Sequence, residues 1–193
     1  GGGIGRLAAL GLGVKVMFNP HGWAFSMKGS KVKSWIYLMI ERTLAHATDQ
    51  FVMISNYEKM LAVQRHVGNA DRMKVIFNGV DTENIRKTAA LSMISRRDVG
   101  IPEDAYVIGM VGRISPQKAP DVFVRMAAEV VKKIPKAWFV IVGDGEQREE
   151  ILALAEQLGI ADRLTITGWT ENPIDYTKMF DQAVLLSRWE GFG

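Results

Sequence analysis

The sequence contains no cysteine, which excludes disulfide bonds and thiolate metal sites. Only His21, His46 and His66 remain as imidazole ligands, and their spacing is unlike that of a zinc-binding helix. The absence of cysteine is also consistent with a reducing compartment.

A strong excess of charge of one sign is absent too. The 24 Lys and Arg residues are nearly balanced by 21 Asp and Glu residues, which leaves a net charge of +3. Charge therefore gives no indication of nucleic-acid binding, and any basic effect must be local. With 48% hydrophobic residues, the chain can still form a substantial core.

Long apolar runs are also missing. The stretch from Trp35 to Ile40 is too short to span a bilayer, and no signal-peptide pattern opens the chain. We therefore expect a soluble, cytoplasmic protein. Because there is no initiating Met and the sequence stops directly after a Gly-rich turn, we also expect a fragment of a longer protein.

Short runs of β-branched and aromatic residues alternate with segments whose apolar residues recur at helical spacing. The short runs are the predicted strands: Val14–Phe18, Phe51–Ile54, Lys74–Phe77, Tyr106–Val111, Trp138–Val142, Leu164–Thr167 and Ala183–Leu186. The clearest helical spacings are those of Val122, Met126, Val130 and Ile134, and of Ile151, Leu154, Ala155 and Leu158. Such strict alternation predicts an α/β protein with parallel sheets and right-handed crossovers.

A turn signal, Asn78–Asp81, is followed by a polar stretch that extends to about Gly100. We interpret this stretch as a boundary between two Rossmann-like domains, both incomplete. Residues 1–86 would form the C-terminal part of the first domain, residues 87–100 a linker, and residues 101–193 the first part of the second.

Two cations follow the predicted strand Tyr106–Val111. Gly112 ends the strand, Arg113 and Lys118 lie in the loop, and a helix begins near Pro120. A guanidinium grips a phosphate through two hydrogen bonds, an ammonium adds a mobile charge, and a glycine lets a ligand approach the backbone. The helix dipole adds positive potential. The loop therefore suits a diphosphate, although two solvated cations would give the same pattern.

A carboxylate and bare amides follow the predicted strand Ala183–Leu186. Glu190 precedes Gly191, Phe192 and Gly193. A carboxylate accepts hydrogen bonds from sugar hydroxyls, and backbone amides donate to others. Because the carboxyl ends of parallel strands share one edge of a sheet, we expect this segment and the cationic loop at the ligand-binding edge. The alternative is a solvent-exposed Glu in a flexible turn.

Four motifs, in this order, resemble the retaining GT-B glycosyltransferases of the large family four. They are Val75–Asp81, Val111–Arg113 with Lys118, Val142–Gly145, and Glu190–Gly193. The resemblance covers nearly the whole chain and is greatest to bacterial cell-surface polysaccharide transferases.

The resemblance implies transfer of a sugar, with retained configuration, from a nucleotide-diphosphate donor to a glycan or lipid-linked acceptor. We expect the donor to be UDP-linked. The family residues that match Arg113 and Lys118 hold the diphosphate and stabilise its developing charge. The residue that matches Glu190 contacts sugar hydroxyls, and the family pattern adds a second Glu beyond Gly193. The residue that matches His21 lies near the donor sugar and the acceptor.

The same resemblance gives Gly112 and the amides of Gly191, Phe192 and Gly193 a part in donor binding. Because the two cations neutralise the phosphates, we expect no metal and no cofactor apart from the donor as co-substrate. Lipid-linked acceptors would place the protein at the inner face of the membrane.

Two other functions stay open. The stretch Gly3–Ala8 has the spacing of a dinucleotide-binding fingerprint, which would indicate an NAD-dependent oxidoreductase of Rossmann type. No strand precedes this stretch, and the next predicted strand ends at Asn19 rather than at an acid, so we favour a helix start packed on a sheet. The second alternative is a noncatalytic nucleotide-sugar binding module.

Two details near the cationic loop need interpretation. Ala119 follows Lys118 where family relatives commonly have Gly, and we expect its Cβ to narrow the phosphate approach. Asp144 and Glu146 have the spacing of an acidic metal motif, but they precede a helix that begins near Gln147. Helix capping is therefore the simpler explanation for these acids.

A basic segment precedes the apolar stretch Trp35–Ile40. Lys28, Lys31 and Lys33 stand at the start of a predicted helix that contains this stretch. Such a helix suits an anionic membrane surface. A core helix with a charged entry fits the same residues, and we favour that interpretation.

Overall fold

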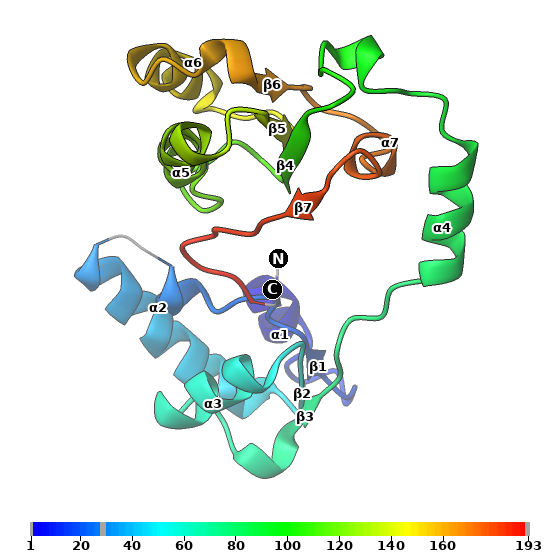
Figure 1. The fold of residues 1–193 in the computed structure, drawn as a ribbon. Helices are drawn as coiled ribbons and strands as arrows, with labels where there is room; N and C mark the ends of the chain where they lie inside the picture. Colours follow the sequence, from blue (N-terminus) through cyan, green and yellow to red (C-terminus); the bar gives the residue numbers. More distant parts are fainter. Residues whose placement is uncertain (1, 28–29, 192–193) are drawn as a thin grey trace. The chain divides into compact units, whose positions relative to one another are not determined.

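The structure is a computed structural model that describes residues 2–27 and 30–191 (Figure 1). The chain forms two compact units. Unit 1 runs to Val80 and includes the segment from Trp189, whereas unit 2 comprises Asp81–Arg188. The predicted domain limits, with a linker at residues 87–100, stay a prediction.

Unit 1 contains a parallel sheet in the order β1-β2-β3. The strands are β1 (Met17–Phe18), β2 (Gln50–Met53) and β3 (Met73–Val75). The helices of this unit are α1 (Gly2–Ala8), η1 (Ala24–Ser26), α2 (Lys31–Leu44), η2 (Ala45–Ala47), α3 (Asn56–Gln64) and η3 (Ala70–Arg72). Aromatic rings fill the core: Trp23 stacks on Phe25 at 5.3 Å between centroids and tilts against Phe51 at 6.5 Å.

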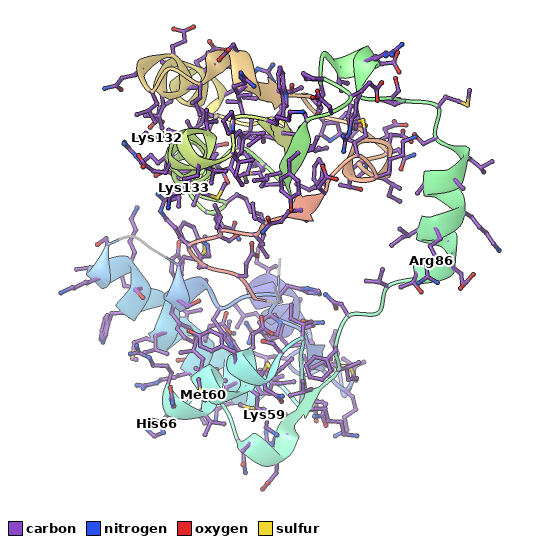
Figure 2. All side chains as sticks on the ribbon, viewed as in Figure 1. Lys59, Met60, His66, Arg86, Lys132 and Lys133 are labelled. Atoms are coloured by element: carbon purple, nitrogen blue, oxygen red, sulfur yellow. The ribbon has the colours of Figure 1, made fainter. Side chains whose placement is uncertain are left out.

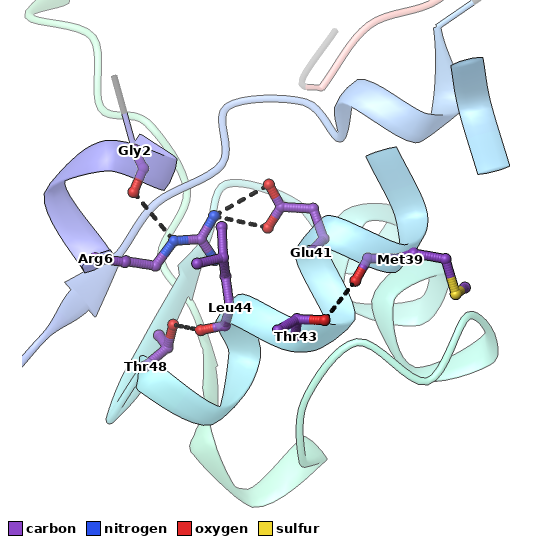
Figure 3. Close-up of polar contacts among 7 residues, drawn as sticks. All are labelled: Gly2, Arg6, Met39, Glu41, Thr43, Leu44 and Thr48. Atoms are coloured by element: carbon purple, nitrogen blue, oxygen red, sulfur yellow. Dashed lines mark hydrogen bonds and ion pairs between the residues drawn. The ribbon is translucent and has the colours of Figure 1, made fainter. Parts of the chain in front are cut away.

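Helix α1 is held by one buried cation, Arg6 (Figure 3). Its Nη2 donates to both carboxylate oxygens of Glu41 on α2, at 3.0 and 2.8 Å, and its Cζ lies 3.7 Å from the ring centroid of Phe18 on β1. A buried charge is tolerated only when it is paired, and here the pairing joins α1 to α2 and to the sheet. Gly3 and Gly5 therefore lie inside a helix and not in a strand-to-helix turn, so the dinucleotide fingerprint is not supported.

Unit 2 contains a parallel sheet in the order β6-β5-β4-β7. The strands are β4 (Tyr106–Val111), β5 (Ala137–Val142), β6 (Leu164–Ile166) and β7 (Gln182–Ala183). The helices are α4 (Thr82–Leu91), η4 (Arg97–Val99), α5 (Pro120–Lys133), α6 (Arg148–Gln157), η5 (Ala161–Arg163) and α7 (Ile174–Thr177).

Both faces of the sheet in unit 2 are covered, as Figure 1 shows for α5 and α6 on one side and α7 on the other. Phe139 and Ile141 of β5 pack in the same core cluster as residues of α5 and α6. Val140 and Val142 alternate with them and pack in the cluster that Tyr176 joins from α7. A parallel sheet buried on both faces explains why its strands are continuous apolar runs.

The α/β class and the parallel sheets are confirmed. Strands β3 and β6 are each one residue shorter than predicted, and two others differ more: β1 contains only Met17–Phe18 of the predicted residues 14–18, and β7 covers Gln182–Ala183 instead of residues 183–186. Helix α4 lies within the polar stretch and was not predicted. It buries no residue and is capped by Asp81, whose side chain accepts from Asn84 N at 2.9 Å, so no apolar period marks it.

The favoured interpretation of α2 as a core helix is confirmed for one face of the helix: Leu38 packs in the core cluster of unit 1 with Trp23 and Phe51, and Met39 packs against that cluster. Of the stretch Trp35–Ile40, Leu38 is buried, whereas Trp35, Ile36, Tyr37 and Ile40 are exposed. Lys28 lies outside the described residues. Within the described part of the chain, no helix is both long enough and apolar enough to cross a membrane.

Gly109 in β4 lets the ring of Phe180 reach the sheet, because an added Cβ would overlap that ring. We expect Gly109→Ala to lower the free energy of unfolding by about 1–3 kcal/mol, as overpacking usually does. Urea denaturation measures the change. In a Phe180→Leu background the loss should shrink. Gly5→Ala, at a helical site with no atom within 4 Å, is the matched control and should not destabilise. Equal losses for Gly109→Ala in both backgrounds would contradict the packing explanation.

Candidate functional site

The cationic loop follows β4 at the carboxyl edge of the sheet in unit 2. Arg113 comes directly after Gly112, and the aliphatic part of Lys118 passes over Gly112, since an added Cβ there would lie 3.4 Å from its Cγ, Cδ and Cε. The amide of Lys118 donates to Ser115 O at 3.1 Å, which closes the turn. The structure therefore brings Gly112, Arg113 and Lys118 together.

Arg113 forms an ion pair with Glu146. Its Nε donates to Glu146 Oε2 at 3.0 Å, and both side chains are largely exposed. Exposed ion pairs contribute between about 0 and 1 kcal/mol, so an anionic ligand can replace Glu146 at little cost. Asp144 makes a second pair, with Arg148 at 3.7 Å. Asp144 thus pairs with the first residue of α6 and Glu146 with the cationic loop, whereas helix capping was expected; the N-cap of α6, Gln147, has no side-chain capping bond.

The cationic loop rests on the backbone of the loop after β5. The amide of Gly112 donates to Val142 O at 3.0 Å, and the amide of Ile114 donates to Asp144 O at 2.9 Å. An added Cβ at Gly143 would overlap the carbonyl oxygen of Gly112, and one at Gly145 would overlap that of Ile114. The two glycines therefore let the loops approach closely enough for these bonds, a role that the sequence interpretation did not assign.

A pocket opens beside the cationic loop within unit 2. It has a volume of about 440 Å³ and is lined by Val111, Gly112, Arg113, Val142, Gly143, Asp144, Trp169, Thr170 and Pro173. Its walls come from the loops after β4, β5 and β6, and Trp169 presents a ring that is 74% exposed. The volume lies in the usual range for small-ligand sites. The pocket therefore combines the cation of Arg113, the backbone of Gly112 and Gly143, and the aromatic ring of Trp169.

Ala119 adopts the left-handed conformation, with φ 54° and ψ 49°, at the N-cap of α5. This conformation explains why glycine suits the position. Its side chain is fully buried, so the methyl group does not face the phosphate approach. The expected narrowing was therefore wrong, and the consequence of this substitution is conformational strain.

Arg188 joins the chain after β7 to the cationic loop and was missed by the sequence interpretation. Its amide donates to Gln117 O at 2.8 Å and its Nη1 to Pro116 O at 2.8 Å. Its Nη2 donates to Asp121 Oδ2 at 2.5 Å. The hydrogen bond from Arg188 lowers the pKa of Asp121, and the same contact raises the pKa of Arg188. This half-buried pair fixes the loop against the first turn of α5.

The predicted residue His21 lies in the loop after β1, in unit 1. It is exposed and has a φ of 48°, and its amide donates to Asn19 Oδ1 at 3.3 Å. Glu58, which is 2% exposed, holds this loop: its carboxylate accepts from Gly22 N, and its backbone carbonyl accepts from Trp23 Nε1 at 3.1 Å. The other oxygen of Glu58 accepts from Ile54 N at 3.0 Å.

Gly191 joins the same part of unit 1. Its carbonyl accepts from Ser55 Oγ at 2.8 Å, and an added Cβ would lie 2.8 Å from Glu58 Oε1 and 2.9 Å from Gly22 N. The residues directly after His21 and Glu190 are therefore packed together. Ser55 also caps α3 by accepting from Glu58 N at 3.1 Å, and the pattern Ser-x-x-Glu was an available signal for this cap alone.

Phe192 and Gly193, two of the predicted donor-binding residues, lie outside the described residues. Among residues 2–27 and 30–191, no group of three or more His, Cys, Asp or Glu side chains is placed to hold a metal ion. Metal independence stays a prediction.

Two family models match this chain. The model of "Glycosyl transferases group 1" matches residues 93–193, and that of "Glycosyltransferase Family 4" matches residues 1–84. The chain belongs to the group 1 glycosyltransferases.

Curated relatives agree with this assignment. The Escherichia coli UDP-Gal:alpha-D-GlcNAc-diphosphoundecaprenol alpha-1,3-galactosyltransferase is 31% identical over 97% of this chain and 50% of its own length. The D-inositol 3-phosphate glycosyltransferase of Thermomonospora curvata is 30% identical over 100% of this chain and 49% of its own length. The chain therefore spans about half the length of these relatives.

Solved structures show the same fold at lower identity. Anabaena HepE in complex with UDP has a TM-score of 0.78 and 20% identity, over 100% of this chain and 52% of that protein. WaaG, a glycosyltransferase involved in lipopolysaccharide biosynthesis, has a TM-score of 0.68 and 17% identity, over 91% of this chain and 51% of that protein. The fold of these neighbours is GT-B.

We expect Gly145→Ala to displace the backbone of Ile114 and with it Arg113, because the new methyl group overlaps the Ile114 carbonyl. Unit 2 should lose about 1–3 kcal/mol of stability, as measured by urea unfolding. The amide of Ile114 should also exchange faster with deuterium than in the unchanged protein. Unaltered exchange at Ile114 would contradict the proposed support of the loop.

We expect Asp121→Asn to destabilise the protein in a pH-dependent way. The pKa of Asp121 is lower when folded, so its contribution is fully present above roughly pH 4 and is lost as the pH falls through the lowered pKa. The variant should lose roughly 1–2 kcal/mol at pH 7 and much less near pH 2.5. Urea unfolding at both pH values measures this. Asp162→Asn, at an exposed acid, is the control and should change little. An equal loss at both pH values would contradict the ion-pair account.

Proposed function

We propose that this protein contributes to the transfer of a sugar from a UDP-sugar donor to a glycan or lipid-linked acceptor in bacterial polysaccharide biosynthesis. The family supports a transferase, and the names of relatives support the substrates. The Escherichia coli enzyme is named for UDP-Gal and a diphosphoundecaprenol-linked acceptor. HepE was solved with UDP and also with UDP-glucose, the latter at a TM-score of 0.74. A hexosyl donor and a position at the inner face of the membrane belong to the same proposal.

The observation that carries the proposal is the cationic loop beside its pocket. Arg113 and Lys118 share one short loop at the carboxyl edge of a parallel sheet, where ligands of such sheets bind. The adjoining pocket offers the ring of Trp169 and the backbone of Gly112 and Gly143. In the proposed complex the diphosphate contacts the two cations, and the rest of the nucleotide occupies the pocket.

The chemistry follows from where charge develops. When the bond between the anomeric carbon and the phosphate oxygen breaks, the departing diphosphate gains negative charge. Cations positioned at this charge are usually the largest single catalytic contribution, and loss of one such donor typically costs about 10²–10³ in rate. When the donor binds, Arg113 leaves its ion pair with Glu146 and contacts the diphosphate instead. Lys118 adds a second positive charge. With both cations present we propose that no divalent metal is needed, and loss of transfer on chelation would overturn this point.

Glu190 and His21 complete the proposed site. The carboxylate of Glu190 orients hydroxyls of the donor sugar together with the amides of Gly191, Phe192 and Gly193, and His21 lies near the sugar and the acceptor. The packing of Gly191 against Gly22 supports their shared role. For retention we propose a same-face substitution assisted by the departing phosphate, rather than a covalent route through Glu190. A trapped glycosyl ester on Glu190 would overturn this preference.

The alternatives are weaker. An NAD-dependent oxidoreductase is disfavoured because the glycines of the candidate fingerprint lie inside α1. A noncatalytic nucleotide-sugar binding module would bind UDP in the same way but would transfer no sugar, so a transfer assay separates it from the enzyme.

The test is calorimetry of the chain with UDP and with NAD. We expect UDP alone to bind, and Arg113→Glu to weaken binding by at least about 100-fold, because charge-assisted hydrogen bonds are replaced by repulsion. Arg125→Glu, at an exposed position on α5, makes the same charge change in the same unit and should leave UDP affinity unchanged. Binding of NAD alone, or equal affinity of the Arg113→Glu variant for UDP, would refute the proposal.

A further inference from the structure

Unit 1 contains a pocket that is rich in cations and has no part in the proposed donor site. It has a volume of about 710 Å³ and lies where η2 leads into β2 and η3 leads into β3, which is the amino edge of the parallel sheet. His21 follows β1, so it lies at the opposite, carboxyl edge. We call this cavity the amino-edge pocket. Its lining residues are Arg42, Ala45, His46, Val63, His66, Gly68, Asn69, Ala70 and Arg72.

The polar groups of the amino-edge pocket are mainly hydrogen-bond donors. Four of its nine lining residues are Arg or His, and none is Asp or Glu. Nε of Arg42 donates to Arg65 O at 2.8 Å, and Nη1 of Arg72 donates to Thr48 O at 3.4 Å. These bonds fasten both guanidinium groups to the backbone and leave most of their five N–H donors for other acceptors. Within residues 2–27 and 30–191, neither group forms an ion pair with a carboxylate.

The acids close to this pocket lie outside its walls. Asp49 accepts from Val16 N at 2.8 Å and from Lys15 Nζ at 3.0 Å. These two hydrogen bonds lower the pKa of Asp49, and the charge of Arg72 contributes less. Asp71 is exposed, and it does not line the pocket either. The positive charge of the walls is therefore left for a ligand.

His66 has a strained backbone at the end of α3, where Figure 2 labels it. Its φ is 54°, and the amide of the next residue, Val67, donates to Ala62 O at 2.9 Å. This is the pattern of a helix end that is closed by a left-handed residue, a position at which glycine is usual because a Cβ is disfavoured. A strained side chain that lines a pocket indicates a function for that side chain. The imidazole of His66 supplies an N–H donor.

A smaller pocket adjoins the first and also has donor capacity left over. It has a volume of about 230 Å³, and it shares His46 and Arg72 with the amino-edge pocket. Arg6 lines it too and is 2% exposed, and its Nη1 has no hydrogen-bond partner in the described part of the chain. A buried donor without a partner is costly, so an acceptor is favoured in this region.

We propose that the amino-edge pocket binds a soluble organic phosphate. The phosphate oxygens accept from the guanidinium groups of Arg42 and Arg72, and the imidazoles of His46 and His66 donate further hydrogen bonds. A phosphate suits these converging donors better than a carboxylate, because it presents more acceptor oxygens. The volume lies in the usual range for small-molecule sites, and the organic part contacts apolar wall residues such as Val63.

This inference goes beyond the proposed function and does not rest on it. The two sites share no residue, and a method that resolves single residues reports on Arg113 and on His66 separately. Failure of either proposal therefore leaves the other standing.

The test is a two-dimensional NMR titration of the isotope-labelled 193-residue chain with phenyl phosphate. We expect the amides of His66 and Arg72 to shift together, with a Kd of about 1 mM or tighter. Inorganic phosphate should bind about 10-fold more weakly, because it lacks the apolar part. Equal affinity for both would mean an adventitious ion only and would overturn the proposal. Shifts that require phosphatidic acid vesicles, with none for phenyl phosphate, would overturn it as well.

Matched variants test the walls. Arg42→Gln and Arg72→Gln should each weaken phenyl phosphate binding at least about 10-fold, because each removes a charge-assisted hydrogen bond. Arg65→Gln makes the same change at an exposed neighbour that does not line the pocket, and it should leave the affinity unchanged. Equal effects of Arg65→Gln and Arg72→Gln would contradict the proposed site.

His66→Gly separates binding from folding. Glycine relieves the left-handed strain, so the midpoint of thermal unfolding, followed by circular dichroism, should not fall. The affinity for phenyl phosphate should nevertheless fall by about threefold to tenfold, because one hydrogen-bond donor is lost. A residue with a purely structural role would give the reverse result, namely lower stability with unchanged affinity, and that result would overturn the proposal.

Discussion

The close approach of two backbones within unit 2 is the constraint on which the proposed donor site depends. The loops after β4 and β5 touch where Gly143 meets Gly112 and Gly145 meets Ile114. Side chains at either glycine would force the loops apart and break the hydrogen bonds that hold Gly112 and Ile114. The position of Arg113, which lies between Gly112 and Ile114, therefore depends on the absence of side chains at Gly143 and Gly145.

A second constraint fixes the other end of the cationic loop. Arg188 satisfies two backbone carbonyls of the loop and pairs with Asp121 at the start of α5. The loop that carries Lys118 is thus fixed at one end by the backbone of the loop after β5 and at the other end by the start of α5. Pre-organisation of this kind matters for catalysis, because fixed cations need no rearrangement when charge develops on a ligand.

Much of the fold was predictable from the sequence. Strands β4 and β5 are continuous apolar runs because both faces of their sheet are covered, and the prediction matched them to within one residue. Helix α6 buries Ile151 and Ala155 of its predicted spacing. Helix α5 exists as predicted, but its buried face is Phe123, Val124, Ala127 and Ala128, whereas Val122 and Ile134 of the predicted spacing are exposed. Helix α4 buries no residue, so no apolar period marks it in the sequence. Helix α2 packs Leu38 in the core and leaves other apolar residues exposed, a division between faces that the apolar run did not reveal.

The candidate site was predictable only in part. Chemistry-bearing residues such as Arg113 and Lys118 follow a recognisable strand, so their place at the sheet edge followed from topology. The supporting residues depend on long-range contacts that local patterns do not encode. Glu58 accepts from Gly22, 36 residues earlier, and Arg188 pairs with Asp121 across 67 residues. Ser55 with Glu58 gave a capping signal, but that signal did not reveal the loop that Glu58 holds.

The most direct measurement is a crystal structure of this chain with UDP. The account predicts diphosphate oxygens within about 3.2 Å of the Arg113 guanidinium and the Lys118 ammonium, with Arg113 released from Glu146 and the loop backbone unmoved. A diphosphate bound away from this loop, or an Arg113 that stays paired with Glu146 while UDP is bound, would contradict it.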